Sequence, residues 1–171
     1  MRMMKVAFLD RDGTIVSDYP DDFWHTVREP EFLPGAIEAL AALRHKDYQI
    51  IIVSNQYLID EGLITQEQYD TFSARMLKVL ATHGIQVLDI FYGPHRRDSG
   101  CACRKPKPGM IEAALTRHPS IDLSQSFLVG DSPCDVELTE RIGLRAFSIG
   151  FAAGRSGVTK VAWLSDVVAF V

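Results

Sequence analysis

Short apolar runs alternate along the chain with longer segments whose apolar residues recur every three or four positions. The runs are too short for independent helices and are bounded by polar or glycine-containing turns, so each predicts a strand. Apolar runs without interposed polar residues are typical of strands covered on both faces, as in a parallel sheet. The predicted strands lie at 6–9, 49–53, 85–92, 126–131 and 145–149, with a short further strand at 162–164.

The segments between these runs combine helical periodicity with helix-end signals. Thr65 and Gln68 form a capping-box pattern at one helix start. Gly84 and Gly143 follow the ends of two periodic segments, where a left-handed residue commonly terminates a helix. The predicted helices lie at 35–46, 65–83, from 108 onwards and at 133–142, with a short terminal helix capped by Ser165; the predicted loops lie at 15–24, 93–107 and 151–160.

Alternation of strands and helices throughout the chain predicts an α/β fold, with a parallel sheet and right-handed crossovers. No internal repeat and no change of composition marks a boundary, so we expect a single domain over residues 1–171. Ligands of such sheets bind beyond the carboxyl ends of the strands. Polar residues that follow the predicted strands are therefore the candidate functional residues.

Composition excludes several classes of protein. Apolar residues make up 47% and charged residues 23% of the 171 residues, as in ordinary globular chains. The net charge of −4 argues against broad nucleic-acid or anionic-membrane binding, and no apolar run reaches membrane-spanning length. No signal-peptide pattern precedes the first strand, and three cysteines do not make a disulfide framework. We expect a cytoplasmic monomer with reduced thiols.

The first predicted strand ends in two carboxylates, Asp10 and Asp12, followed by Gly13. Residues i and i+2 of an extended chain share a face, so both carboxylates are expected to aim at one point, with Arg11 turned away. Converging carboxylates repel each other unless a proton or a hard cation such as Mg2+ lies between them. The alternative interpretation is a strand followed by a plain Asp-Gly turn.

Other predicted strands also end in residues that can bind a phosphate or a cation. Hydroxyl and amide groups donate hydrogen bonds to anions, and a third carboxylate adds a cation ligand. The loop 15–24 begins beside the two aspartates and is expected to form a rim of the site. The further candidates are Ser54, Asn55, Gln56 and Asp131, together with Arg104 and Lys105 in the cation-rich loop 93–107.

Four short motifs, taken together and in order, resemble the four motifs of the haloacid dehalogenase (HAD) superfamily. They are Asp10-Arg11-Asp12-Gly13-Thr14, Ser54-Asn55-Gln56, Arg104-Lys105-Pro106 and Gly130-Asp131 with Asp135. The stretch Cys103–Met110 is more narrowly similar to the histidinol-phosphate and D-glycero-D-manno-heptose-1,7-bisphosphate phosphatase-like subfamily. The resemblance spans nearly the whole chain and implies a Rossmann-like, HAD-like fold. Short segments after the first two motifs imply a nearly capless member.

The resemblance implies a Mg2+-dependent phosphomonoesterase. Asp10 would attack phosphorus to give an aspartyl-phosphate, and Asp12 would act as general acid and then as general base. Mg2+ would be held by the Asp10 side chain, the Asp12 backbone carbonyl and Asp131. Ser54 and Lys105 would neutralise the transferring phosphoryl oxygens.

The resemblance also implies roles for neighbouring residues. Asp135 would support the metal ligands without ligating the ion. Arg104 would contact the substrate rather than phosphorus, and Asn55 and Gln56 are further substrate-binding candidates. The motif alignment favours Lys105 over the nearby Lys107 as the motif lysine.

A zinc site is the other cofactor implied by the resemblance, and here the chain departs from the subfamily pattern. The subfamily often carries Cys-x-His followed by Cys-x-Cys, a ligand set suited to structural zinc. His95, Cys101 and Cys103 are present, but Gly93 stands in place of the first cysteine. Either zinc is lost, or a water or another side chain completes three protein ligands. The third thiol, Cys134, is expected to be a buried small residue.

The expected substrate is a small phosphorylated metabolite, either a sugar bisphosphate or histidinol phosphate. The segment 57–61 departs from the sequence that heptose phosphatases carry there, which weakens a transfer of their substrate. A 3'-phosphatase acting on nucleic acid is disfavoured, because no basic stripe with aromatic residues is visible. The alternative class is a non-catalytic, receiver-like phosphoacceptor or phosphate-binding module, which would not need the second aspartate, Asp12.

Overall fold

The computed structural model describes all residues 1–171 and contains one six-stranded sheet. All neighbouring strands are parallel, in the order β3-β2-β1-β4-β5-β6, so β1 lies at the centre of the sheet. The α/β prediction is therefore confirmed. The strands are β1 Val6–Leu9, β2 Gln49–Asn55, β3 Asp89–Gly93, β4 Phe127–Gly130, β5 Arg145–Ile149 and β6 Val158–Val161.

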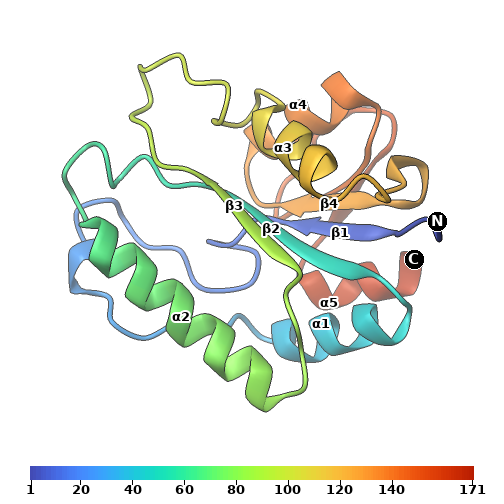
Figure 1. Cartoon of the computed structure of the whole chain (residues 1–171), viewed down its shortest axis with the longest axis horizontal. Coiled ribbons are helices and arrows are strands. Elements are labelled where there is room, and N and C mark those ends of the chain that lie inside the picture. Colours follow the sequence, from blue (N-terminus) through green and yellow to red (C-terminus); the bar gives the residue numbers. More distant parts are fainter.

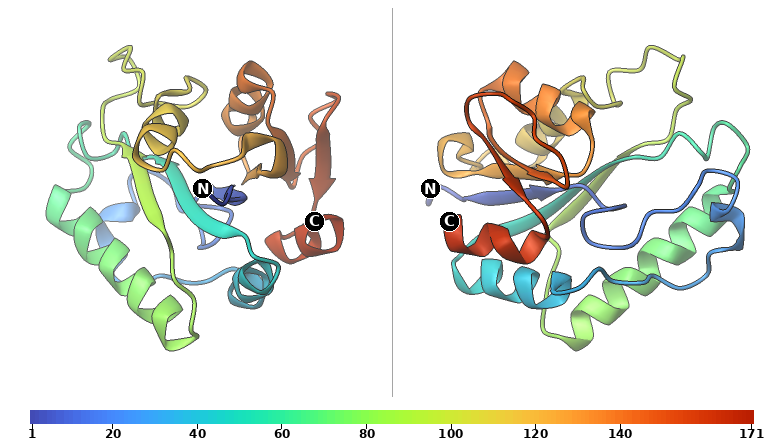
Figure 2. Two further views of the ribbon diagram at one scale, coloured as in Figure 1. Left: turned by 45° about the vertical axis from the view of Figure 1, so that its right-hand side comes forward. Right: turned by 180° about the vertical axis from the view of Figure 1, so that it is seen from behind.

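Helices cover both faces of the sheet (Figures 1 and 2). One face carries α1, α2 and α5, and the opposite face carries α3 and α4. None of the helices is both long and apolar enough to span a membrane. The helices are α1 Ala36–His45, α2 Gln66–Thr82, α3 Gly109–Arg117, α4 Pro133–Ile142 and α5 Leu164–Val167.

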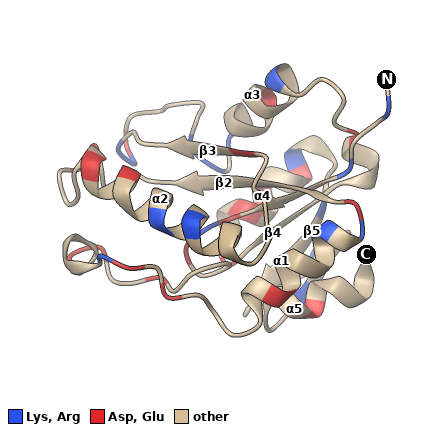
Figure 3. Ribbon diagram, turned by 60° about the horizontal axis from the view of Figure 1, so that its bottom comes forward, with Lys and Arg blue, Asp and Glu red and all other residues tan.

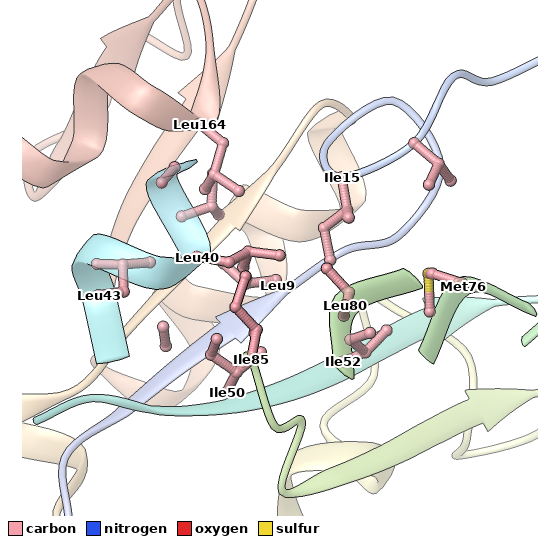
Figure 4. Close-up of a cluster of buried hydrophobic side chains, with 14 of the residues drawn as sticks. Leu9, Ile15, Leu40, Leu43, Ile50, Ile52, Met76, Leu80, Ile85 and Leu164 are labelled. Carbon is pink, nitrogen blue, oxygen red and sulfur yellow. The ribbon is translucent and has the colours of Figure 1, made fainter. Parts of the chain in front are cut away.

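Two apolar cores follow from the alternation of side chains along the central strands. In β1, Ala7 and Leu9 belong to the core under α1 and α2, whereas Val6 and Phe8 belong to the core under α3 and α4. Figure 4 shows part of the larger core, in which Leu9 and residues of β2 lie against helix side chains. Burial on both faces explains why these strands are continuous apolar runs.

The helix-end signals work as the sequence suggests. The Thr65 hydroxyl accepts a hydrogen bond from the Gln68 amide at 3.0 Å, and the Gln68 side chain accepts one from the Thr65 amide at 2.8 Å. Gly143 ends α4 in the left-handed conformation, at φ 69°. Both caps satisfy backbone groups that a helix end leaves without partners.

Three predicted elements differ from the structure. β3 begins at Asp89 rather than at position 85, because pairing with β2 starts at Ile51. The segment 158–161 pairs with β5 as an edge strand, although it was expected to be loop, and 162–164 is not a strand. Only Val161 of β6 is buried, so the strand lacks the apolar run that identified the others. The terminal helix begins at Leu164, one residue before the expected cap Ser165.

The carboxyl ends of β1, β2, β3 and β4 meet at one edge of the sheet, where the segments 10–35, 56–65 and 94–108 begin (Figure 1). Within 10–35 the only helix is the 3-10 turn Trp24–Thr26, and the segment 56–65 has none. No additional folded unit is therefore inserted at the two positions after the first and second motifs, which agrees with the expectation of a nearly capless chain.

Candidate active site

A cleft opens at the carboxyl edge of the sheet, directly beyond β1. Its walls come from the segments that follow β1, β2, β3 and β4, so residues far apart in the sequence meet there. The lining is strongly polar, with five carboxylates and three cationic side chains. It consists of Asp10, Asp12, Asp18, Asp21, Trp24, Asn55, Gln56, Tyr57, Leu58, Arg97, Arg104, Lys105, Asp131, Ser132 and Cys134.

Three carboxylates converge on one point of this cleft. Asp10 follows β1, Asp131 follows β4, and Asp135 lies in the first turn of α4. One carboxylate oxygen of each lies within 4.8 Å of the others. Asp135 was expected to support the metal ligands without ligating the ion, but its carboxylate lies as close to Asp10 and Asp131 as a ligand would. It also accepts a hydrogen bond from the Ser132 amide at 3.2 Å.

Lys105 supplies the only cation inside this carboxylate cluster. Its ammonium donates to Asp10 at 3.0 Å, to Asp135 at 2.6 Å and to the Val53 carbonyl at 2.9 Å. The side chain is only 1% exposed. Burial alone lowers the pKa of Lys105, but the charges of Asp10 and Asp135 outweigh burial and raise it, so the ammonium stays charged.

One lysine does not neutralise three carboxylates. Burial, followed by the negative charge of Asp10, raises the pKa of Asp131 well above its usual range. Burial also raises the pKa of Asp135, against the opposing effect of Lys105. A hydrogen bond between the Asp131 and Asp10 side chains raises the pKa of Asp131 further. The cluster therefore has an excess of negative charge and oxygen ligands of the type that Mg2+ prefers.

The residues after β2 position this cluster. Asn55 accepts a hydrogen bond from the Lys105 amide at 2.8 Å and donates to the Lys105 carbonyl at 3.2 Å, so it fixes the lysine's backbone. The Gln56 amide donates to the Ser54 hydroxyl at 2.7 Å. Ser54 is buried and does not line the cleft, whereas Gln56 and Asn55 do.

The Asp12 side chain does not point toward the Asp10 carboxylate, although alternation along an extended strand predicts that it does. Its carboxylate is absent from the cluster around Asp10, and Arg11, expected to be turned away, pairs with it at 2.7 Å. The physical reason is that β1 ends at Leu9 and the chain then turns: the Arg11 carbonyl accepts from the amides of Ile15 at 2.9 Å and Val16 at 3.2 Å. Asp12 still lines the cleft.

The mouth of the cleft has a rim that sequence reasoning largely missed. The Tyr57 hydroxyl donates to Asp21 at 3.0 Å, which lies 3.6 Å from Arg97. The Arg97 guanidinium lies 4.4 Å from the centre of the Tyr57 ring and pairs with Glu61 at 2.8 Å. These residues come from three segments, so no local periodicity could have identified them; only the rim position of 15–24 was expected.

Arg104 stands on the same side of the cleft without an acidic partner. Its guanidinium lies 5.7 Å from the Tyr57 ring centre, and its buried Nε has no hydrogen-bond partner. A guanidinium with free donors in a cleft is suited to an anionic group of a ligand.

The candidate zinc residues also come together, but in a different form from that expected. His95, Cys101 and Cys103 bring their ligand atoms within 4.8 Å of one another. Cys101 and Cys103 are joined by a disulfide, which corrects the expectation that all thiols are reduced. A Cβ atom at Gly93 would lie 2.7 Å from the Cys103 carbonyl oxygen, so close packing there requires glycine. Cys134 is partly buried and free.

Comparison with known proteins places the chain among phosphatases. The D-glycero-alpha-D-manno-heptose-1,7-bisphosphate 7-phosphatase of Photorhabdus laumondii is 37% identical over 171 residues, covering 95% of this chain and 92% of that protein. The histidine biosynthesis bifunctional protein HisB of Campylobacter jejuni is 35% identical over 147 residues, covering 85% of this chain but only 42% of HisB.

A solved structure is similar over its whole length. The D,D-heptose 1,7-bisphosphate phosphatase of B. bronchiseptica, complexed with magnesium and phosphate, superposes with a TM-score of 0.85 at 29% identity, covering 98% of this chain and 97% of that one. Residues 5–161 match the polynucleotide kinase 3 phosphatase family. The chain therefore belongs to this family of HAD-superfamily phosphatases and is a phosphoric monoester hydrolase.

Proposed function

We propose that the chain is a Mg2+-dependent phosphatase that hydrolyses a sugar bisphosphate through an aspartyl-phosphate on Asp10. The observation that carries the proposal is the position of Asp10: it lines the cleft, contacts Lys105 at 3.0 Å and shares a carboxylate cluster with Asp131. A carboxylate that lines a cleft beside a fixed ammonium is suited to attack phosphorus.

The donor set fits Mg2+. Asp10 and Asp131 would ligate the ion through their side chains and Asp12 through its backbone carbonyl, with Asp135 beside them. A Cβ atom at Gly13 would lie 1.9 Å from Asp131 Oδ2, so the chain keeps this space free for the carboxylate. When bound, Mg2+ neutralises part of the charge on the phosphoryl oxygens.

The protein's own groups divide the reaction into two steps. Asp10 forms a bond to phosphorus while the bond to the substrate oxygen breaks, and Asp12 gives its proton to that oxygen. Asp12 then takes a proton from a water that attacks the aspartyl-phosphate, releasing inorganic phosphate and restoring both carboxyl groups. Both residues line the same cleft, but their carboxylates have different partners: Asp10 contacts Lys105 and Asp12 contacts Arg11.

Lys105 and Ser54 are proposed to act on the phosphoryl group. Lys105 places a positive charge beside Asp10, where negative charge develops. Ser54 accepts from Gln56, which leaves its own hydroxyl hydrogen for a phosphoryl oxygen; because Ser54 is buried and does not line the cleft, this contact is proposed from the resemblance of its motif. Asn55 and Gln56 are better assigned to positioning Lys105 and Ser54 than to binding the leaving group.

The cleft favours a small substrate over nucleic acid. Of its three cations, Lys105 is committed to the carboxylate cluster and Arg97 to Glu61 and Asp21. In the view of Figure 3, Lys and Arg are interspersed with Asp and Glu along the ribbon. Nucleic-acid backbones require a basic surface.

A sugar bisphosphate is favoured over histidinol phosphate by Arg104 and by the extent of the similarity. Arg104 offers an unpaired guanidinium that suits a second phosphate, whereas histidinol phosphate carries a cationic amine and no second phosphate. The heptose bisphosphate phosphatase of Photorhabdus laumondii is matched over nearly its full length, and HisB over less than half. Histidinol phosphate is the second candidate.

Zinc is proposed only for the reduced chain. Thiolates are the zinc ligands, so the disulfide between Cys101 and Cys103 and a zinc site exclude each other. In the reduced chain, His95 and the two cysteines offer three ligands, and a water would complete the four. A zinc-to-protein ratio near zero in protein purified under reducing conditions would contradict this assignment.

The alternative, a receiver-like phosphoacceptor, differs in the need for a general acid and base. A long-lived aspartyl-phosphate does not require Asp12, and the similarity to phosphatases disfavours this class. The cytoplasmic location, the monomeric state and the single domain over 1–171 stay predictions.

The test is hydrolysis of a panel containing heptose 1,7-bisphosphate, histidinol phosphate and p-nitrophenyl phosphate, with and without Mg2+. We expect Mg2+-dependent phosphate release that is highest with the heptose bisphosphate and lost in Asp10→Asn. Mg2+ affinity, measured by calorimetry, should fall in Asp10→Asn but stay near the wild-type value in Asp12→Asn. No turnover of any phosphomonoester with Mg2+ present would contradict the proposal.

A further inference from the structure

The Arg11 guanidinium holds both carboxylate oxygens of Asp12. Its Nε donates to Oδ1 at 2.7 Å and its Nη2 to Oδ2 at 3.1 Å. Two parallel hydrogen bonds from a planar guanidinium fix a carboxylate in orientation as well as in position. Arg11 belongs to the first motif by sequence, but it does not line the cleft.

Arg11 is buried among three aromatic rings, which attract a cation but do not dictate how it meets Asp12. Its side chain is 4% exposed, and the guanidinium lies 4.6 Å from the Phe72 ring centre and 5.5 Å from those of Trp24 and Tyr69. Its Nη1 is buried without a hydrogen-bond partner. Burying a cation beside a single carboxylate is a weak source of stability, and an apolar side chain of similar length could fill the same space. Packing among the rings therefore does not by itself explain why this side chain holds both oxygens of Asp12.

A second donor reaches Asp12 from another segment of the chain. The Gln56 amide donates to Asp12 Oδ2 at 3.0 Å and to the Ser54 hydroxyl at 2.7 Å. Gln56 is buried and belongs to the segment after β2, whereas Arg11 belongs to the turn after β1. The Asp12 side chain is thus held between two fixed donors while remaining 17% exposed to the cleft.

We propose that Arg11 is a positioning residue, which holds Asp12 in the orientation needed to give a proton to the leaving oxygen. This inference rests on the general acid role proposed above for Asp12. It assigns Arg11 no contact with the substrate. A misplaced general acid costs the most when the leaving group is an alkoxide, which cannot depart without a proton.

The test compares kcat/KM of Arg11→Met on heptose 1,7-bisphosphate and on p-nitrophenyl phosphate. This ratio reports the steps up to cleavage of the substrate's P–O bond, and p-nitrophenolate leaves without protonation. We expect a fall of about 10- to 100-fold with the sugar phosphate and less than about threefold with the aryl phosphate. Equal losses on the two substrates would overturn the proposal.

A double-mutant cycle isolates the action through Asp12. Adding Arg11→Met to Asp12→Asn should cause no further loss on the sugar phosphate, because the acid that Arg11 positions is already absent. A further loss of about tenfold or more in the double variant would overturn the proposal. Arg11→Lys keeps a charge but not the planar pair of donors, and it should show the same dependence on leaving group if Arg11→Met is poorly folded.

The proposed function and this inference fail in different ways. If Asp12→Asn keeps the wild-type kcat/KM on the sugar phosphate, the general acid role of Asp12 is wrong and this inference falls with it. If Asp12→Asn shows the leaving-group dependence and Arg11→Met does not, only the inference about Arg11 is wrong.

Discussion

Gly13 and Asp131 approach so closely that a Cβ atom at position 13 would lie 1.9 Å from Asp131 Oδ2. Gly13 follows β1 and Asp131 follows β4, so this contact joins two neighbouring strand ends of the sheet. Gly13 also has φ +81°, a backbone conformation that side chains rarely adopt. The glycine of the first motif therefore sets the position of a proposed metal ligand from the fourth.

Gly13→Ala should disrupt both the turn and the position of Asp131. We expect Mg2+ affinity, measured by calorimetry, to fall at least about tenfold, with a loss of about 1–3 kcal/mol in the free energy of unfolding. Gly84→Ala is the matched control, because Gly84 has φ +70° but nothing within 4 Å of its Cβ position. The control should lose about 1 kcal/mol through backbone strain and keep the wild-type Mg2+ affinity. Equal affinities in the two variants would show that the contact does not matter.

The stability of the metal-free protein should fall as pH rises from about 4 to about 8. Burial and the charge of Asp10 raise the pKa of Asp131 to about 8, whereas an unfolded aspartate titrates near 4. Between these pH values the folded state still binds a proton at Asp131 that the unfolded state has released. The free energy of unfolding therefore falls as the pH rises. Mg2+ replaces that proton, and its addition should raise the Tm more at pH 8 than at pH 5.

Thermal unfolding with excess chelator and with Mg2+, at both pH values, checks this expectation. Asp131→Asn is the control, because it should flatten the pH dependence of the metal-free Tm. A Tm of the chelated wild type that rises steadily from pH 5 to pH 8 would contradict the assigned direction.

Lys105→Met should be strongly destabilising. It leaves Asp10 and Asp135 buried without a counter-charge, and removal of one partner from a buried ion pair typically costs about 3–5 kcal/mol. Lys107→Met is the matched control, since Lys107 is exposed and contacts only the Gly100 carbonyl. The control should change the free energy of unfolding by less than about 0.5 kcal/mol. Denaturant titration measures the loss in both variants and also tests the choice of Lys105 as the motif lysine. A larger loss in the free energy of unfolding for Lys107→Met than for Lys105→Met would contradict that choice.

The residues at strand ends were predictable because buried apolar runs locate the carboxyl edge of the sheet. Asp10, Ser54 and Asp131 each follow such a run, and the structure brings them to one edge. Lys105 has no such local signal, and the resemblance of its motif identified it. The order of the strands could not be read from the runs, but the crossover rule made neighbouring parallel strands the expected arrangement.

The orientation of Asp12 and the rim were not predictable for a different reason. Alternation along a strand holds only while the chain is extended, and the turn after Leu9 ends it before Asp12. The contact between Tyr57 and Asp21 spans 36 residues and depends on how two irregular segments fold over the cleft. β6 was missed because an edge strand needs only one buried residue, so its pattern does not differ from that of a loop.

The rim around Tyr57 and the carboxylate cluster around Asp10 are built from different parts of the chain. The cluster sits on strand ends and on α4, which are fixed by the two apolar cores. The rim sits on the connecting segments, which anchor themselves in the larger core through Trp24, Leu58 and Ile64 and present polar side chains to the cleft. Substrate preference and chemistry are thus separable at the level of single side chains: exchange of rim residues outside the cores, such as Asp21, Glu61 and Arg97, offers a route to new specificities on an unchanged hydrolytic centre, in laboratory evolution as in natural divergence.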